Sequence, residues 1–167
     1  MSDTMACFDI IVEGIQPGSP KTTTRHTLTN LLIMLITFII LYNVNQVGVW
    51  GVGLATKRCN VNAVPLGQDS DSWVVNHDAV MYHNKEQKGT MSQSLNEGDT
   101  LGITYDHVHL NFYLNGQPMN CPFSGMKGTV FPVFYVDEGA VLDVQFDHFY
   151  HQPPDGFDSI MIEQSLL

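Results

Sequence analysis

Residues 101–116 read LGITYDHVHLNFYLNG, and this stretch decides the fold class of the chain. Apolar and polar side chains alternate along residues 101–106 and again along residues 108–114, which is the period of a strand with one buried face. Asn115–Gly116 is the favoured pair for a two-residue type I′ turn, because both positions need a positive φ. The stretch therefore predicts antiparallel strands joined by tight turns.

The rest of the chain downstream of residue 46 has the same character. Residues 142–146 alternate in the same way, whereas residues 131–136 are apolar on both faces, as expected for a central strand. Pro132 lies inside that second run and cannot donate a ladder hydrogen bond, so we expect it at a sheet edge or a bulge. No strand alternates with a long helix, and the pattern predicts an all-β fold, an antiparallel β-sandwich.

Length and composition restrict the classes of function. A chain of 167 residues has the size of one domain, and it carries 7 Lys and Arg against 17 Asp and Glu, a formal net charge of -10. Nucleic-acid binding depends on clustered cations that displace counterions, so this balance argues against a nucleic-acid partner. The three cysteines are widely spaced and odd in number, which favours a reducing, cytoplasmic location over a disulfide framework.

Six blocks of sequence, in this order, resemble the SPRY domain. They are VWGVGLAT (49–56), PLGQDSDSWVVNHDAVMYHN (65–84), EGDTLGITYD (97–106), HLNFYLNGQPM (109–119), GTVFPVFYVD (128–137) and AVLDVQF (140–146). The resemblance implies a concanavalin-like sandwich of two antiparallel sheets that binds a protein or short peptide through loops at one end. It also implies a protein that is not an enzyme and needs no cofactor.

The N-terminal third departs from this family. The resemblance begins at residue 47, so we assign 47–167 to a partial SPRY domain that is incomplete at its N-terminus, and we leave residues 1–27 unassigned. Between them, from Leu28 to Val44, lies the uncharged stretch LTNLLIMLITFIILYNV. In the family, several strands precede the WGVGLAT block, and the strand directly before it alternates apolar and charged residues. Here the chain looks like a domain whose first strands have been exchanged for unrelated sequence.

Three interpretations of this apolar segment stay open. As a membrane helix, its seventeen residues at ~1.5 Å each would span about 25 Å, slightly less than a ~30 Å hydrocarbon core, and the protein would be a single-pass membrane variant. As a buried element, its β-branched residues favour extended structure, and it would replace a lost core strand. As the product of alternative splicing or of a misassigned exon, it would have no evolved role.

The three interpretations differ in what they predict for stability. Without a replacement strand, apolar residues of the sheets such as Val49, Trp50, Leu110 and Phe112 would be partly uncovered. Losing a few hundred Å² of apolar burial at ~25 cal/mol per Å² is comparable to the whole stability of a domain. We therefore expect a marginal fold unless the segment packs against that face.

Loops are the expected binding residues, because rigid sheets hold loops in place and loops carry recognition. On the position of the loops alone, we expect a protein-binding surface that contains Gln68, Asp69, Asp71, Asn84 and Tyr135. Because the chain is acidic, we expect the bound segment to be basic or polar.

Other chemistries have weaker support in the sequence. His107 and His109 are spaced to share a strand face, as zinc ligands can be, but no third ligand stands at a defining spacing, so we predict no metal site. No GxSxG motif, phosphate loop or Ser-His-Asp grouping occurs, and we predict no catalytic residue. A lectin-like sugar site would need a metal-ordering loop with aromatic stacking, which the sequence lacks. Trp73 is expected in the core rather than on the floor of a ligand pocket, and Cys121 as a small buried residue rather than a reactive thiol.

Overall fold

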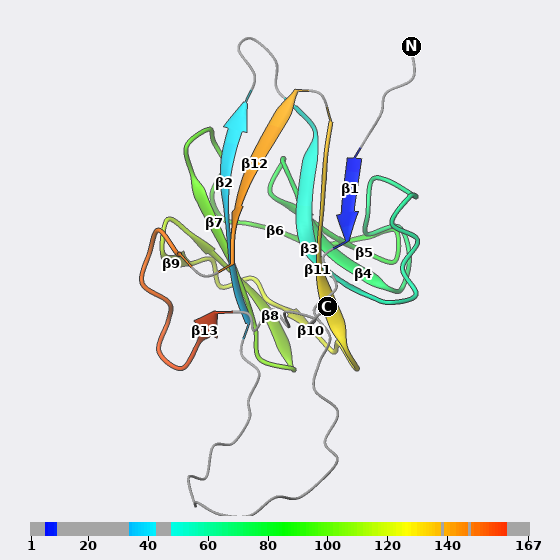
Figure 1. Ribbon diagram of the computed structural model, residues 1–167. Coiled ribbons are helices and arrows are strands. Elements are labelled where there is room, and N and C mark those ends of the chain that lie inside the picture. Colours follow the sequence, from blue (N-terminus) through cyan, green and yellow to red (C-terminus); the bar gives the residue numbers. More distant parts are fainter. Residues whose placement is uncertain (1–5, 10–33, 43–47, 138, 147, 160–167) are drawn as a thin grey trace, which may run out of the picture.

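The computed structural model describes residues 6–9, 34–42, 48–137, 139–146 and 148–159. Every regular element within these ranges is a strand, and the strands form two sheets that lie in two layers (Figure 1). All pairs are antiparallel except the short β13, which pairs with β2 in parallel. The predicted all-β, antiparallel sandwich is confirmed.

The first sheet has six strands in the order β1-β11-β3-β4-β5-β6. Their bounds are β1 (Ala6–Asp9), β11 (Val130–Val136), β3 (Trp50–Thr56), β4 (Ser72–Asn76), β5 (Val80–His83) and β6 (Glu86–Thr90). The strands from β3 to β6 follow one another along the chain, and β11 returns to pair with β3 over the full length of both.

The second sheet has seven strands, of which five lie in the order β10-β8-β7-β2-β12. Their bounds are β10 (Phe123–Ser124), β8 (His109–Leu114), β7 (Thr100–Tyr105), β2 (Met34–Tyr42) and β12 (Ala140–Gln145). The two short strands are β9 (Gln117–Pro118), which pairs with β8, and β13 (Asp158–Ser159), which pairs with β2.

The main core lies between the two sheets. Alternate residues of β3 and β4 face alternate residues of β7 and β8 across it, as the period of two along each strand requires. The largest fully buried side chains of the described residues all belong to this core except Val74, which belongs to a second cluster; they are Trp50, Phe112, Ile40, Leu54, Leu101, Ile103, Leu110, Val52, Val74 and Val75. Apolar burial of this extent is the dominant favourable term in folding.

The predicted hairpin signals hold in part. In β8 buried and half-exposed residues alternate strictly, and the following turn has φ of 50° at Asn115 and 78° at Gly116, as a type I′ turn requires. In β7, by contrast, every residue is buried, although one exposed face was expected. On the outer face of this strand, His151, Gln152 and Pro154 of the C-terminal segment line a hollow together with Thr100 and Gly102, a contact that the period of the strand cannot show.

Pro132 was expected at a sheet edge or a bulge, and it lies in β11, between β1 and β3. Within the described residues, β1 pairs along β11 only as far as Val133, so at Pro132 the strand β11 has a neighbour on the β3 side alone. A residue without an N–H is tolerated at a position where no second strand needs a hydrogen bond from it, and the residue that follows Asp9 in the chain lies outside the described residues.

The apolar segment forms a strand. Its described part, Met34–Tyr42, is β2, which pairs with β7 on one side and with β12 on the other. The interpretation as a helix is therefore wrong for these residues, and the structure supports the replacement core strand. A segment without a role is not supported, because β2 joins β12 to the rest of its sheet. Residues 28–33 and 43–44 lie outside the described residues.

A strand in this position explains the burial of the neighbouring core. Trp50 and Leu110 are 0% exposed and Phe112 is 1% exposed, while Val49 is half-buried. Ile40 of β2 is itself fully buried in the main core. No helix long and apolar enough to cross a membrane is found among the residues that the structure describes.

Candidate loop-face interaction site

The connection between β3 and β4 folds back over the outer face of the first sheet. There Leu66 joins Ala55, Val74, Val133 and Tyr135 in a second apolar cluster, separate from the main core. The loop can approach this closely because of Gly67, which has a φ of 90°. A Cβ added to Gly67 would lie 2.8 Å from the Cβ of Tyr82 and 2.9 Å from Cγ2 of Val74. The cluster holds the loop against the rigid sheet.

Asp69 organises the end of this loop. Its Oδ1 accepts hydrogen bonds from the backbone N–H of Asp71 at 3.0 Å and from the hydroxyl of Ser72 at 2.7 Å. The Ser72 hydroxyl oxygen in turn accepts the N–H of Gly67 at 2.9 Å. One oxygen of the Asp69 carboxylate thus holds the turn of its own loop.

Asp71 ties the loop to the end of β3. Its Oδ1 accepts the hydroxyl of Thr56 at 2.6 Å and the Nε and Nη2 of Arg58 at 3.2 and 2.9 Å. The hydrogen bond from Thr56 and then that from Arg58 hold the pKa of this carboxyl below its usual range. The exposed fraction is 17% for the Asp71 side chain and 82% for Arg58. The carboxylate is therefore withdrawn while the guanidinium reaches solvent.

The turn between β5 and β6 completes the surface. Asn84 and Lys85 have φ of 53° and 64°, as in a two-residue type I′ turn. The N–H of Asn84 donates to the carbonyl of Asp69 at 2.9 Å, and the N–H of Lys85 donates to that of Gly67 at 3.0 Å. These two bonds lock the turn to the loop. We call the surface formed by residues 57–71 and the Asn84–Lys85 turn the loop face.

Four of the predicted binding residues meet on the loop face. Gln68 and Asn84 are exposed there, and Asp69 and Asp71 are half-buried beneath them. The loop placement of Tyr135 is wrong, because this residue lies in β11 and is 2% exposed. Burial, followed by the charges of Tyr82 and Asp78, raises the pKa of its hydroxyl to about 12. Tyr135 supports the loop from below and cannot contact a partner directly.

The sequence interpretation missed the cations of this surface. Lys57, Arg58 and Lys85 are all exposed on the loop face. Because Asp71 is paired and one oxygen of Asp69 is used by its own loop, the face is not the acidic rim that the net charge suggested. A signal was present in the sequence: residues 57–88 contain four of the chain's 7 Lys and Arg, namely Lys57, Arg58, Lys85 and Lys88.

Trp73 lies at the inner side of the same end of the sheet. It is 7% exposed, belongs to the main core and stacks on His83 with ring centroids 4.7 Å apart, so its prediction as a core residue is confirmed. The Nδ1 of His83 lies 2.8 Å from the carbonyl of Ser72. Because a carbonyl oxygen can only accept, Nδ1 carries the proton, and this bond fixes the ring beside the loop face.

The structure gives no support to the two other chemistries considered, a metal site and a reactive thiol. Among the described residues, no group of three His, Cys, Asp or Glu side chains is placed to hold a metal ion. His107 instead opens a turn with a φ of 69°, in which Asp106 Oδ1 accepts the N–H of Val108 and of His109. Cys121 packs against the core, and burial raises the pKa of its thiol, which opposes reactivity.

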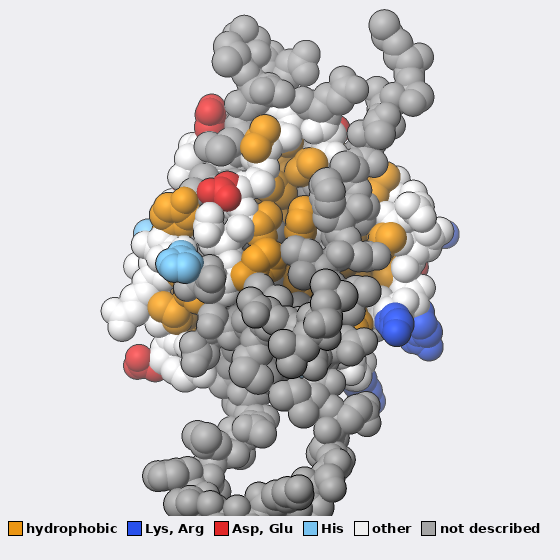
Figure 2. All heavy atoms as spheres, viewed as in Figure 1, with side chains coloured by type: hydrophobic (Ala, Val, Ile, Leu, Met, Phe, Trp, Pro, Cys, Tyr) orange, Lys and Arg blue, Asp and Glu red, His pale blue; other side chains and the backbone are white. Residues whose placement is uncertain are grey.

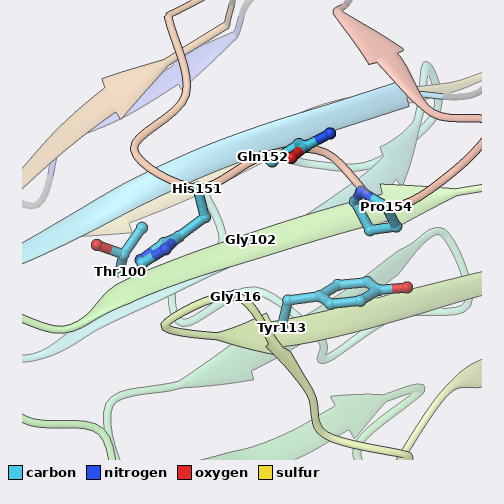
Figure 3. A pocket seen from close by; sticks show the side chains of 7 residues that line it. All are labelled: Thr100, Gly102, Tyr113, Gly116, His151, Gln152 and Pro154. Carbon is cyan, nitrogen blue, oxygen red and sulfur yellow. The ribbon is translucent and has the colours of Figure 1, made fainter.

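A shallow hollow lies on the outer face of the second sheet, away from the loop face (Figure 3). Figure 3 shows the rings of Tyr113 and Pro154 facing one another across it, with His151 beside Thr100. Its lining consists of Thr100, Gly102, Tyr113, Gly116, His151, Gln152 and Pro154. The hollow marks where the C-terminal segment lies over β7 and β8.

Comparisons with known proteins agree with this architecture. The sequence model of the SPRY domain family matches residues 39–149. The chain belongs to the SPRY domain family. The match begins inside β2, so it includes part of the apolar segment as well as the loop face.

Individual relatives give a closer similarity. The chain is 52% identical over 128 residues to SPRY domain-containing protein 7 of Mus musculus and of Homo sapiens, and 51% identical to that of Gallus gallus. Each alignment covers 75% of this chain but 65% of the relative. The chain therefore spans less than two thirds of the length of these relatives.

Proposed function

We propose that this protein is a non-enzymatic docking module that binds a protein or a short peptide through the loop face. SPRY domains in general mediate protein interactions, and the chain has the fold of that family. Four residues expected at the binding surface, Gln68, Asp69, Asp71 and Asn84, converge on one surface held by backbone hydrogen bonds. This convergence carries the proposal.

The construction of the loop face suits recognition. The β3–β4 loop and the β5–β6 turn are bonded to one another, and the second apolar cluster holds the loop to the sheet. A surface that is ordered before binding loses little conformational entropy when a partner docks. The exposed amide groups of Gln68 and Asn84 offer hydrogen bonds of both kinds to the backbone of an extended peptide. On the cysteine content we place this function in the cytoplasm.

A displayed library of random linear peptides, selected on the full chain, tests the proposal. We expect enriched peptides whose binding weakens in Gln68→Ala and in Asn84→Gly, the latter chosen because Gly keeps the left-handed φ. Gln93→Ala, an exposed side chain outside the loop face, is the matched control. Peptides that bind all three variants equally well would overturn the assignment of the loop face.

A further inference from the structure

We propose that the segment bound at the loop face is acidic, and that Lys57, Arg58 and Lys85 hold its Asp and Glu side chains. This inference rests on the proposed function and adds the chemical class of the partner. It opposes the expectation from net charge, which favoured a basic or polar segment.

The distribution of cations is the first argument. In the described part of the chain, four of five Lys and Arg residues lie between residues 57 and 88, and the fifth is Lys127. In Figure 2 the visible Lys and Arg side chains lie on the right of the view, on the side of the β3–β4 loop. A protein with net charge -10 thus gathers the cations of its folded part near one surface. Local charges decide which side chains are accepted in contact, because opposite charges attract most strongly at short range.

The second argument is how charges are used within the loop face. The Oδ1 of Asp71 accepts from Thr56 and Arg58, and the Oδ1 of Asp69 accepts from its own loop. Lys57 and Lys85 make no ion pair with any residue that the structure describes. One oxygen of each carboxylate thus serves the fold, whereas the ammonium groups of Lys57 and Lys85 are left to a partner.

Arg58 is positioned for a carboxylate. Its Nε and Nη2 both donate to Asp71, which fixes the plane of the guanidinium, while the side chain stays 82% exposed. The Nη1 edge is directed away from that pair and has two further N–H groups. An arginine held in this way is pre-organised to bind a second carboxylate.

Lys85 gives the third argument. Its φ of 64° is the left-handed region, which Gly or Asn adopts easily and Lys does not. The N–H of Lys85 and the N–H of Asn84 are both bonded to the β3–β4 loop, so the strained residue is held in one place. This φ is what the type I′ turn requires, and the two hydrogen bonds present the exposed Lys85 side chain to solvent from a fixed backbone position.

Other polyanions fit less well. Nucleic acids and anionic membranes present extended arrays of negative charge, which the net charge of -10 repels at separations within about a Debye length. A peptide with a few acidic side chains makes only local contacts. The three cations of the loop face are enough for that.

Peptides recovered in the selection and a synthetic oligoglutamate, with oligoglutamine as its matched probe, test the inference on the full chain. We expect loop-face binders rich in Asp and Glu, and binding of oligoglutamate but not of oligoglutamine. Lys57→Glu and Lys85→Glu should each weaken binding about tenfold, as for charge pairs in contact. The matched control is Lys127→Glu, an exposed cation outside the loop face, and it should leave binding within about twofold. If the charge reversal in Lys57→Glu disturbs the fold, Lys57→Gln takes its place, because it removes the positive charge without adding a negative one.

The outcomes separate the acidic partner from the docking function. Loop-face binders that lack acidic residues and ignore both charge reversals would overturn the acidic partner and leave the docking function standing. Binders that map elsewhere on the chain would overturn both. A preference for phosphatidylserine vesicles or for inorganic phosphate over oligoglutamate would also overturn the peptide class.

Discussion

Tyr135 is a single residue whose burial makes stability depend on pH. Its pKa is raised to about 12 in the folded protein, against an ordinary value of 10.0, chiefly by burial. The folded state thus favours the neutral phenol. The associated stability is fully present below pH 10, and it is lost as the pH rises through about 12.

We therefore expect the free energy of unfolding to fall between about pH 10 and pH 12 by up to roughly 3 kcal/mol from this group. Denaturant unfolding of the protein and of Tyr135→Phe, measured at several pH values in this window, checks the prediction. The Phe variant lacks the phenol and should lose less stability over the same range. Parallel losses in the two proteins would assign the effect to other groups.

Lys85 offers a second test at the same scale. A left-handed conformation costs a non-glycine residue ~1–2 kcal/mol, part of which glycine returns through its greater freedom in the unfolded chain. We expect Lys85→Gly to raise the free energy of unfolding by about 0.5–1 kcal/mol while it weakens binding at the loop face. Asn84→Gly, at a residue that tolerates this φ, should change stability less. A destabilised Lys85→Gly protein would mean that the side chain serves the fold.

The residues of the proposed binding surface could be predicted only as far as the loops could be. The loop positions of Gln68, Asp69, Asp71 and Asn84 were predicted correctly because turn-forming residues mark the ends of strands. Tyr135 was misplaced because the apolar run around it has no period that separates a strand from its end. Arg58 and Lys85 were missed because a charge count over the whole chain hides where the charges gather.

At the scale of elements, β2 shows what an apolar run leaves undecided. Residues from Leu31 to Leu41 are apolar apart from Thr37, and such a run fits a helix, a buried strand or a membrane span. The structure resolves this through pairing, because β7 and β12 each offer an edge to the segment. A strand with neighbours on both sides needs no alternation in its sequence when both faces are covered.

The core role of β2 predicts a large effect of one truncation. Ile40 is fully buried in the main core. Ile40→Ala should therefore lower the free energy of unfolding by about 2–5 kcal/mol. Val141 of β12 is 44% exposed, and Val141→Ala should change it by about 0.5 kcal/mol or less. Chemical denaturation of the three proteins compares the two effects. If the two variants were equally stable, the conclusion that β2 contributes to the core would be wrong.

At the scale of the whole molecule, alternation and turn residues were sufficient to predict two antiparallel sheets from residue 47 onward. The covering of their outer faces was not predictable in this way. Gly67 lets the β3–β4 loop lie on one sheet, and residues from 151 to 154 lie over the other. These contacts join different segments of the chain, so the alternation of apolar and polar residues along one strand cannot predict them.

The net charge of the chain predicts how its thermal stability depends on salt. With 7 Lys and Arg against 17 Asp and Glu, the folded chain repels itself, and ions screen that repulsion with a Debye length of ~30 Å at 0.01 M and ~10 Å at 0.1 M salt. We expect the thermal midpoint at pH 7 to rise by a few degrees between about 0.01 and 0.15 M NaCl. At pH 4.8, near the isoelectric point, the same addition should have little effect, which makes this pH the internal control. An equal rise of the thermal midpoint at both pH values would show that salt acts on apolar burial instead. A fall of the midpoint at pH 7 would mean that attractive pairs such as Arg58 with Asp71 outweigh the net repulsion.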